Sequence, residues 1–172
     1  LLDQKHTPFS HRFDATKPIK EGGHTIHDYH AENKMLTLPE VFMVSSNIGT
    51  ARMAQEIGTP GLKSMFADLG LLKKMEFEID EVAAPIIPNP WRDINTLTAS
   101  YGHGIAGTPL KMRAAVSSIV NGGFKVAPKL VMDIDTDKKV PEQVRVVSKE
   151  TSLKMRQLMR LVVSHGTGKK AN

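Results

Sequence analysis

The chain has 172 residues, 40% of them apolar, which suits a single domain with a hydrophobic core. Its 23 basic and 18 acidic residues leave a mild excess of +5, and only 5% of the residues are aromatic, so we do not expect nucleic-acid binding. The absence of cysteine excludes disulfides, thiolate catalysis and cysteine-based zinc sites.

The first segment, residues 1–36, is polar, charged and rich in histidine. Prolines and a pair of glycines interrupt any regular period. We expect an extended polar arm here, with short strands near 17–20 and 24–26.

Five of the seven histidines lie in this arm, and His24, His27 and His30 are spaced by threes. Imidazole is the commonest nitrogen ligand, so this spacing is compatible with a metal site. No carboxylate or thiol cluster accompanies it at a spacing typical of metal ligands, which favours a solvated loop. We therefore predict neither a metal nor a cofactor.

A capping box opens the next segment, TLPEVFMVSSNIGTARMAQEIG at 37–58. Thr37 is the expected N-cap, because Glu40 lies three residues later and can bond back to it. Pro39 then falls in the first turn, where proline is tolerated. The pattern predicts a helix that begins directly after Thr37.

This helical pattern is interrupted at Ser45-Ser46-Asn47, so we expect two helical pieces that meet at this corner. Behind the corner, apolar residues repeat at a helical interval at Ile48, Ala51, Ala54 and Ile57. Gly58 can supply a left-handed C-cap. A hydroxyl and a carboxamide two residues apart can face one cleft at such a corner, but Ser-x-Asn alone is too short a pattern to indicate a function.

Three further helices are expected at 59–70, 108–120 and 148–164, each opened by a threonine or serine N-cap. Between them, three prolines make 71–92 irregular. Three glycines make 96–107 a segment of tight turns or close backbone approach.

Within 124–147 the hydrophobic period shifts towards two, which predicts short strands on either side of a charged turn at 133–139. The final residues, 165–172, read as a loop. The chain is therefore expected to be α-rich, with a minor set of strands. The expected parts of this one partial domain are an arm, a helical region with Ser-x-Asn, short strands, a helix and a loop, at 1–36, 37–123, 124–147, 148–164 and 165–172.

Three long blocks stand in an order typical of one protein family, namely LPEVFMVSSNIGTARMA (38–54), LTASYGHGIAGTPLKMRAAVSSIVNGG (97–123) and LKMRQLMRLVVSHGTGKKAN (153–172). Together with FDATKPIKEGGHTIHDYH (13–30), they resemble the transpeptidase domain of class B penicillin-binding proteins, most closely the division-specific (septal) peptidoglycan D,D-transpeptidases. The resemblance implies an α+β, serine β-lactamase-like domain that is only partial here. Most of it would be helices with short strands, and its central sheet would be largely missing.

Enzymes of this kind build their site from Ser-x-x-Lys, Ser-x-Asn and Lys-Thr-Gly. The chain contains only the middle motif, as Ser45-Ser46-Asn47, and none of its serines has a lysine three residues on. By resemblance, the first motif would precede Leu1 and the last would follow Asn172. We therefore interpret the chain as a fragment between two catalytic motifs.

The resemblance implies acyl transfer, in which a serine outside these residues attacks the penultimate D-Ala carbonyl of a stem peptide. Ser45 would pass a proton towards the leaving nitrogen. Asn47 would fix the lysine base and hold the substrate amide through its carboxamide. Ser46 is expected to point away. The alternative for Ser45 is a structural role as the N-cap of the helix that begins at Asn47.

The implied parent is a periplasmic enzyme anchored in the bacterial inner membrane. Its implied partners are D-Ala-D-Ala stem peptides, β-lactams and division-complex proteins. The fragment alone is expected to be inactive and to self-associate through an exposed apolar face. One alternative is a non-catalytic interaction module of the cell envelope on the same fold. Another is a serine β-lactamase, although the block resemblance points away from it.

Overall fold

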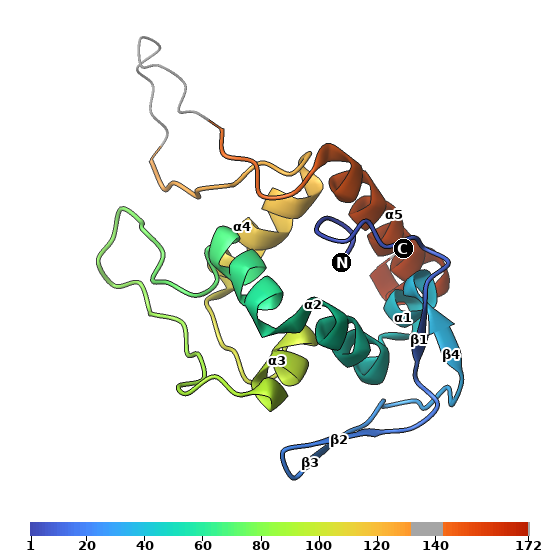
Figure 1. Ribbon diagram of the computed structural model, residues 1–172. Coiled ribbons are helices and arrows are strands. Elements are labelled where there is room, and N and C mark those ends of the chain that lie inside the picture. Colours follow the sequence, from blue (N-terminus) through green and yellow to red (C-terminus); the bar gives the residue numbers. More distant parts are fainter. Residues whose placement is uncertain (132–142, 172) are drawn as a thin grey trace.

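The computed structural model describes residues 1–131 and 143–171. In these ranges it contains short strands, α-helices and one 3-10 turn, in the order β1 (Arg12–Asp14), β2 (Ile19–Glu21), β3 (His24–Ile26), β4 (Met35–Thr37), α1 (Leu38–Val44), α2 (Asn47–Asp68), α3 (Asp93–Ser100), α4 (Pro109–Val120), α5 (Lys149–His165) and η1 (Lys169–Ala171). The helices are arranged around the N-terminal residues, β1 and β4 lie beside α1, and β2 and β3 lie at the lower edge of the view (Figure 1). The described residues contain more helix than strand, as predicted.

The strands form two separate antiparallel ribbons, β1 with β4 and β2 with β3. In the first ribbon Phe13 lies opposite Leu36, and in the second Ile19 lies opposite Ile26. All four side chains are buried in the core. Alternation along a strand turns every second residue inward, so a segment that is polar in composition still supplies core residues.

The α1 helix begins as predicted, with Thr37 as N-cap and a complete capping box to Glu40. Its inner face buries Leu38 and Val41. Gly49 lets α2 approach this face closely, because a Cβ at that position would lie 2.5 Å from Val41 Cγ2.

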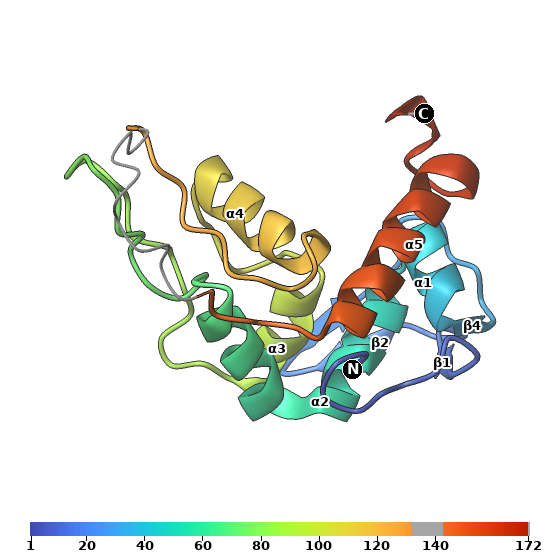
Figure 2. The same ribbon diagram turned by 90° about the horizontal axis from the view of Figure 1, so that it is seen from above.

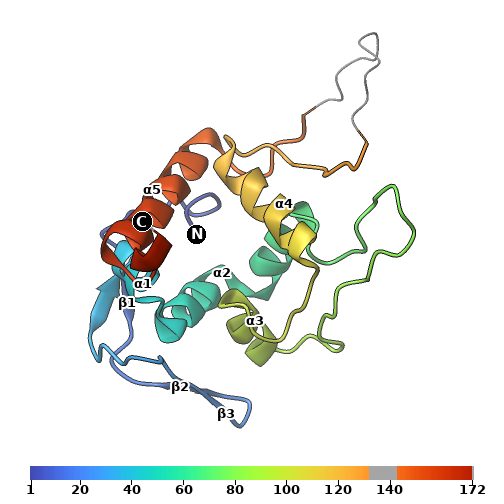
Figure 3. The ribbon, with the colours of Figure 1, turned by 180° about the vertical axis from the view of Figure 1, so that it is seen from behind.

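The α2 helix is broken at Gly58, whose φ of 75° and ψ of 167° are not helical. The helix then restarts at Thr59-Pro60, as the sequence predicts, and Gly70 has a left-handed φ of 75° just beyond its end. From behind, α3 lies along α2 (Figure 3). Leu97 of α3 belongs to the same buried core as Ile19 and Ile26 of the second ribbon.

Helix α3 occupies part of 96–107, where glycine-rich turns were expected. Its threonine, serine and asparagine residues are weak helix formers, so the local pattern did not reveal it. Asn95 Oδ1 accepts from the Arg92 N–H at 2.8 Å, and Trp91 Nε1 donates to Thr96 Oγ1 at 2.8 Å. Tertiary packing and these caps override the weak propensity.

The prediction of short strands over 124–147 is wrong for the described residues of that range. They contain an isolated bridge between Phe124 and Arg145, in place of the strands expected at 124–126, 129–131 and 144–147. Lys125 N donates to Val144 O at 2.8 Å and Val146 N to Gly123 O at 2.7 Å. A strand needs a longer ladder than these bonds supply. The turn expected at 133–139 lies outside the described residues.

The two remaining helices begin where the sequence predicts, with Thr108 as N-cap of α4 and Ser148 as N-cap of α5. Viewed from above, α5 passes beside α1 and carries the C-terminal residues to its far end (Figure 2). Leu158 of α5 is buried in the same core as α1 and α2. This packing brings the end of the chain to the corner between those two helices.

Candidate active site

The corner between α1 and α2 is built by two consecutive serines with different backbone conformations. Ser45 ends α1 in the left-handed region, with φ 54° and ψ 48°. Ser46 is extended, with φ −72° and ψ 117°, and is the N-cap of α2. A left-handed residue other than glycine costs about 1–2 kcal/mol and is held here by the surrounding hydrogen bonds. The chain turns sharply as a result.

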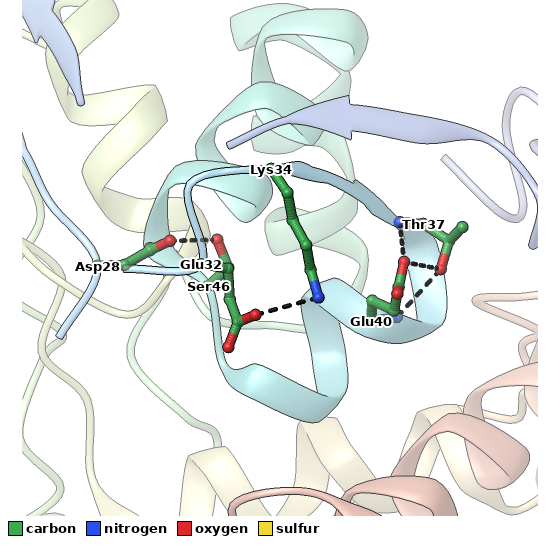
Figure 4. A network of polar contacts seen from close by, with 6 residues as sticks. All are labelled: Asp28, Glu32, Lys34, Thr37, Glu40 and Ser46. Carbon is green, nitrogen blue, oxygen red and sulfur yellow. Dashed lines mark hydrogen bonds and ion pairs between the residues drawn. The ribbon is translucent and has the colours of Figure 1, made fainter. Parts of the chain in front are cut away.

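Ser46 faces inward and is only 1% exposed. Its Oγ donates to Asp28 Oδ2 at 2.8 Å (Figure 4). The same Oγ accepts from the Gly49 N–H at 2.9 Å. The other oxygen of Asp28 accepts from the Ile48 N–H at 2.9 Å. Asp28 therefore satisfies the start of α2 and joins it to the loop after β3.

Ser45 faces the opposite way and is exposed. Because Ser46 caps α2, the alternative interpretation of Ser45 as that N-cap is wrong. The Ser45 hydroxyl lies 2.8 Å from Thr167 Oγ1, across 122 residues of sequence. It is thus held by the segment that follows α5.

Asn47 is the first residue of α2 and is half-buried. Its Nδ2 donates to the backbone carbonyl of His27 at 2.9 Å. Ser45 and Asn47 therefore lie on the same corner. Their side chains bond to two different segments, Ser45 to the turn after α5 and Asn47 to the loop after β3. This arrangement fixes one end of the Asn47 carboxamide and leaves its Oδ1 as an acceptor.

Asp28 and Thr167 are the residues at this corner that sequence reasoning missed. Asp28 lies 18 residues before its partner Ser46, and Thr167 lies 122 residues after Ser45. No local spacing encodes either contact. The available signal was that both residues fall inside blocks that resemble the family.

Close to the corner, acidic and basic side chains are paired along the loop that enters α1. Lys34 Nζ lies 3.1 Å from Glu32 Oε2, and Glu40 Oε2 accepts from the N–H and the hydroxyl of Thr37 at 2.7 Å each (Figure 4). The backbone N–H of Thr37, followed by its hydroxyl, lowers the pKa of Glu40 below its ordinary value. The contacts between Thr37 and Glu40 stabilise the start of α1.

An apolar cavity among the described residues is not lined by the serine or the asparagine of the corner. It has a volume of about 230 Å³, and its lining includes Leu1, Phe42, Met53 and Met155. Neither Ser45 nor Asn47 lines it. The corner is therefore separate from this cavity, which is lined mainly by the N-terminal residues and by helices α1, α2 and α5.

Among residues 1–131 and 143–171, no group of three or more histidine, cysteine, aspartate or glutamate side chains is placed to hold a metal ion. His24, His27 and His30 are all exposed. In the same residues, every helix is too short or too polar to cross a bilayer.

Comparison with known proteins identifies the family. The family model described as the penicillin binding protein transpeptidase domain matches residues 1–172. A relative from Caulobacter vibrioides, named as a probable peptidoglycan D,D-transpeptidase FtsI, is 40% identical over 156 residues, which are 91% of this chain and 26% of the relative. The chain thus spans about a quarter of the length of that curated relative.

Solved structures show the same fold. The transpeptidase domain of penicillin-binding protein 3 from Burkholderia pseudomallei superposes with a TM-score of 0.89 at 25% identity, covering 99% of this chain and 52% of that one. Penicillin-binding protein 3 from Mycobacterium tuberculosis, complexed with aztreonam, gives a TM-score of 0.81 at 27% identity, covering 95% and 40%. These matches confirm the predicted α-rich, partial α+β fold. The chain belongs to the penicillin-binding protein transpeptidase domain family.

Proposed function

We propose that this chain forms one wall of the active site of a serine-type D,D-transpeptidase that cross-links peptidoglycan stem peptides during septal cell-wall synthesis. The observation that carries the proposal is that the two serines differ: Ser46 is buried as the N-cap of α2, whereas Ser45 is exposed in a left-handed turn. Family membership supports the same conclusion. The nucleophilic serine and its lysine base lie outside residues 1–172.

The proposed reaction is acyl transfer from a D-Ala-D-Ala end to an amine of a second stem peptide. The nucleophilic serine attacks the penultimate D-Ala carbonyl, and terminal D-Ala leaves when its nitrogen gains a proton. Ser45 supplies the hydroxyl that passes this proton. Asn47 orients the base and the substrate amide through its carboxamide, whose position is set by the bond to His27.

β-Lactams are proposed as covalent ligands of the same site. They resemble the D-Ala-D-Ala end and acylate the same serine, and the aztreonam complex of the Mycobacterium tuberculosis relative supports this. We further propose that the protein is a periplasmic enzyme anchored in the inner membrane, working with division-complex proteins. The name of the Caulobacter relative supports the assignment as a peptidoglycan D,D-transpeptidase.

The test uses the full-length protein that contains this chain, incubated with a fluorescent penicillin. The wild type is expected to become covalently labelled. Ser45→Ala is expected to slow labelling by about 10²-fold, the lower end of the range for a lost proton-transfer group. Ser64→Ala, which changes an exposed serine on the same α2 helix, is the matched control and should label at the wild-type rate.

Unlabelled wild-type protein would refute the proposal and favour the non-catalytic interaction module of the cell envelope. Labelling of Ser45→Ala at the wild-type rate would show that Ser45 takes no part in acylation. Rapid release of hydrolysed penicillin would indicate a β-lactamase instead.

A further inference from the structure

The proposed catalytic hydroxyl of Ser45 has a partner that lies outside the three family motifs. Thr167 Oγ1 is 2.8 Å from Ser45 Oγ, which is within hydrogen-bond distance. Thr167 belongs to the Gly166-Thr167-Gly168 turn after α5, which the sequence predicted to be only a loop. The contact joins this turn to the corner between α1 and α2.

The backbone sets the position of Thr167 independently of its hydroxyl. The Thr167 N–H donates to Met43 O at 3.0 Å, and the N–H groups of Gly166 and Gly168 donate to Val162 O at 3.0 and 3.1 Å. A Cβ at Gly166 would lie 2.5 Å from Met43 O, so this position needs glycine for the close approach to α1. The backbone bonds therefore hold the turn against α1 without any contribution from the Thr167 hydroxyl.

The side chain of Thr167 is suited to holding a partner in one orientation. Threonine is branched at Cβ, which restricts its χ1 angle more than that of serine. Both hydroxyls are exposed, so the bond between them contributes little to folding. The backbones of both residues are fixed, and the bond between their hydroxyls adds little stability. Its main effect is therefore on the orientation of the two side chains.

We propose that Thr167 is a positioning residue that holds the Ser45 hydroxyl in the rotamer required for proton transfer. This inference rests on the proposed function of Ser45. A hydroxyl has one proton and two lone pairs. When Thr167 donates to Ser45 Oγ, the proton of Ser45 stays free to reach the leaving nitrogen. Thr167 neither gains nor loses a proton over the reaction.

The experiment compares Thr167→Val and Thr167→Ser in the full-length protein. Valine keeps the shape and removes the hydroxyl, whereas serine keeps the hydroxyl and removes the methyl group. Penicillin acylation is followed over a range of concentrations, which separates the first-order acylation constant from the dissociation constant of the complex before the covalent step. Thr25→Val, at an exposed threonine of β3, is the matched control.

Thr167→Val is expected to lower the first-order acylation constant by roughly three- to tenfold, the worth of one ordinary hydrogen bond. The dissociation constant and the melting temperature should stay at their wild-type values, as should all parameters of the control. Thr167→Ser should recover most of the acylation constant. In a Ser45→Ala background, Thr167→Val should have no further effect, because Thr167 acts only through Ser45.

Several results would overturn the positioning role while leaving the proposed function intact. One is a wild-type acylation constant in Thr167→Val. Others are an equal loss in the valine and serine variants, a change confined to the dissociation constant, or a further loss in the Ser45→Ala background. Wild-type protein that penicillin does not acylate would refute the proposed function itself, and the inference with it.

Discussion

The neighbouring serines of the corner show how backbone conformation assigns roles to identical side chains. Ser45 adopts a left-handed conformation and directs its hydroxyl to the surface, where it meets Thr167. Ser46 is extended and directs its hydroxyl into the protein, where it meets Asp28 and the Gly49 N–H. The Ser45 hydroxyl is thereby exposed at the surface, and the Ser46 hydroxyl stabilises the start of α2.

Substitution of each serine by alanine should separate these roles in the 172-residue chain. Ser46→Ala is expected to lower the free energy of unfolding by about 1–2 kcal/mol, because α2 loses its cap and Asp28 loses a donor. Ser45→Ala should change it by less than about 0.5 kcal/mol, since its hydroxyl is exposed. Urea denaturation of the two variants measures both values. Equal losses would contradict the assignment.

Because of Glu40, the free energy of unfolding should depend on pH in the acid range. Its folded-state pKa is lowered from the ordinary 4.5, first by the Thr37 N–H and then by the Thr37 hydroxyl. A lowered carboxyl pKa means that the stabilisation is complete above 4.5 and is lost as the pH falls through the folded-state value. The free energy of unfolding should therefore decrease as the pH falls from 4.5 through the folded-state value.

Glu40→Gln is expected to flatten this acid dependence and to lower the free energy of unfolding at neutral pH by less than about 1 kcal/mol, because glutamine can still close a capping box. Denaturation curves from pH 7 down to about 3 test this, since the variant and the wild type should converge at the acid end. Glu81→Gln, at an exposed loop residue, is the control and should follow the wild-type curve.

At the scale of elements, the packing of α1 on α2 depends on Gly49. A Cβ at that position would lie 2.5 and 2.9 Å from the two γ-carbons of Val41. Gly49→Ala should lower the free energy of unfolding by about 1–3 kcal/mol through overpacking, despite the better helix propensity of alanine. Gly107→Ala, which meets only an ordinary contact at 3.6 Å, is the control.

The clash can be isolated with a double-mutant cycle. Val41→Ala alone leaves a cavity and should also destabilise the chain. Combined with Gly49→Ala, the loss should be smaller than the sum of the single losses by about 1 kcal/mol, because the added methyl group fills the space. Additive losses would show that Val41 is not the group that excludes a side chain at Gly49.

Helix starts were predictable from the sequence, whereas α3 and the ends of the strands were not. Thr37, Thr108 and Ser148 each cap a helix through a hydrogen bond to a residue three positions later, so the signal is local. Helix α3 forms because Leu97 is buried in the shared core, a cause that lies outside its own sequence. The strands expected after residue 123 reduce to one bridge in the described residues, since strand formation needs a paired neighbour.

At the scale of the whole molecule, large apolar side chains are exposed on two outer loops. Ile86 is 73% exposed, and Leu130 and Val131 are 61% and 69% exposed. The loops meet where the Leu130 N–H donates to the carboxylate of Glu78 at 3.2 Å. We predict that these exposed apolar side chains take part in association between copies of the chain.

The isolated 172-residue chain is therefore expected to self-associate. Sedimentation velocity over a range of concentrations should show species larger than the monomer, and the double variant Ile86→Ser, Leu130→Ser should shift the distribution back towards the monomer. A monodisperse wild-type monomer at high concentration would contradict this prediction.

The isolated chain should also remain unlabelled by fluorescent penicillin, while the full-length protein is labelled beside it. None of its serines has a lysine three residues on, and a serine hydroxyl without an adjacent base is a poor nucleophile. Covalent labelling of the isolated chain would show that its own residues suffice for acylation.

The sequence by itself determined the family, the helix starts and the position of Ser-x-Asn at a corner between two helices. Long ordered blocks and hydrogen bonds between residues three apart are properties of the chain alone. Tertiary structure decided which serine of that corner is exposed and what holds it. Asp28 and Thr167 reach the corner across 18 and 122 residues, and only the packing of the β3 loop and of α5 brings them there.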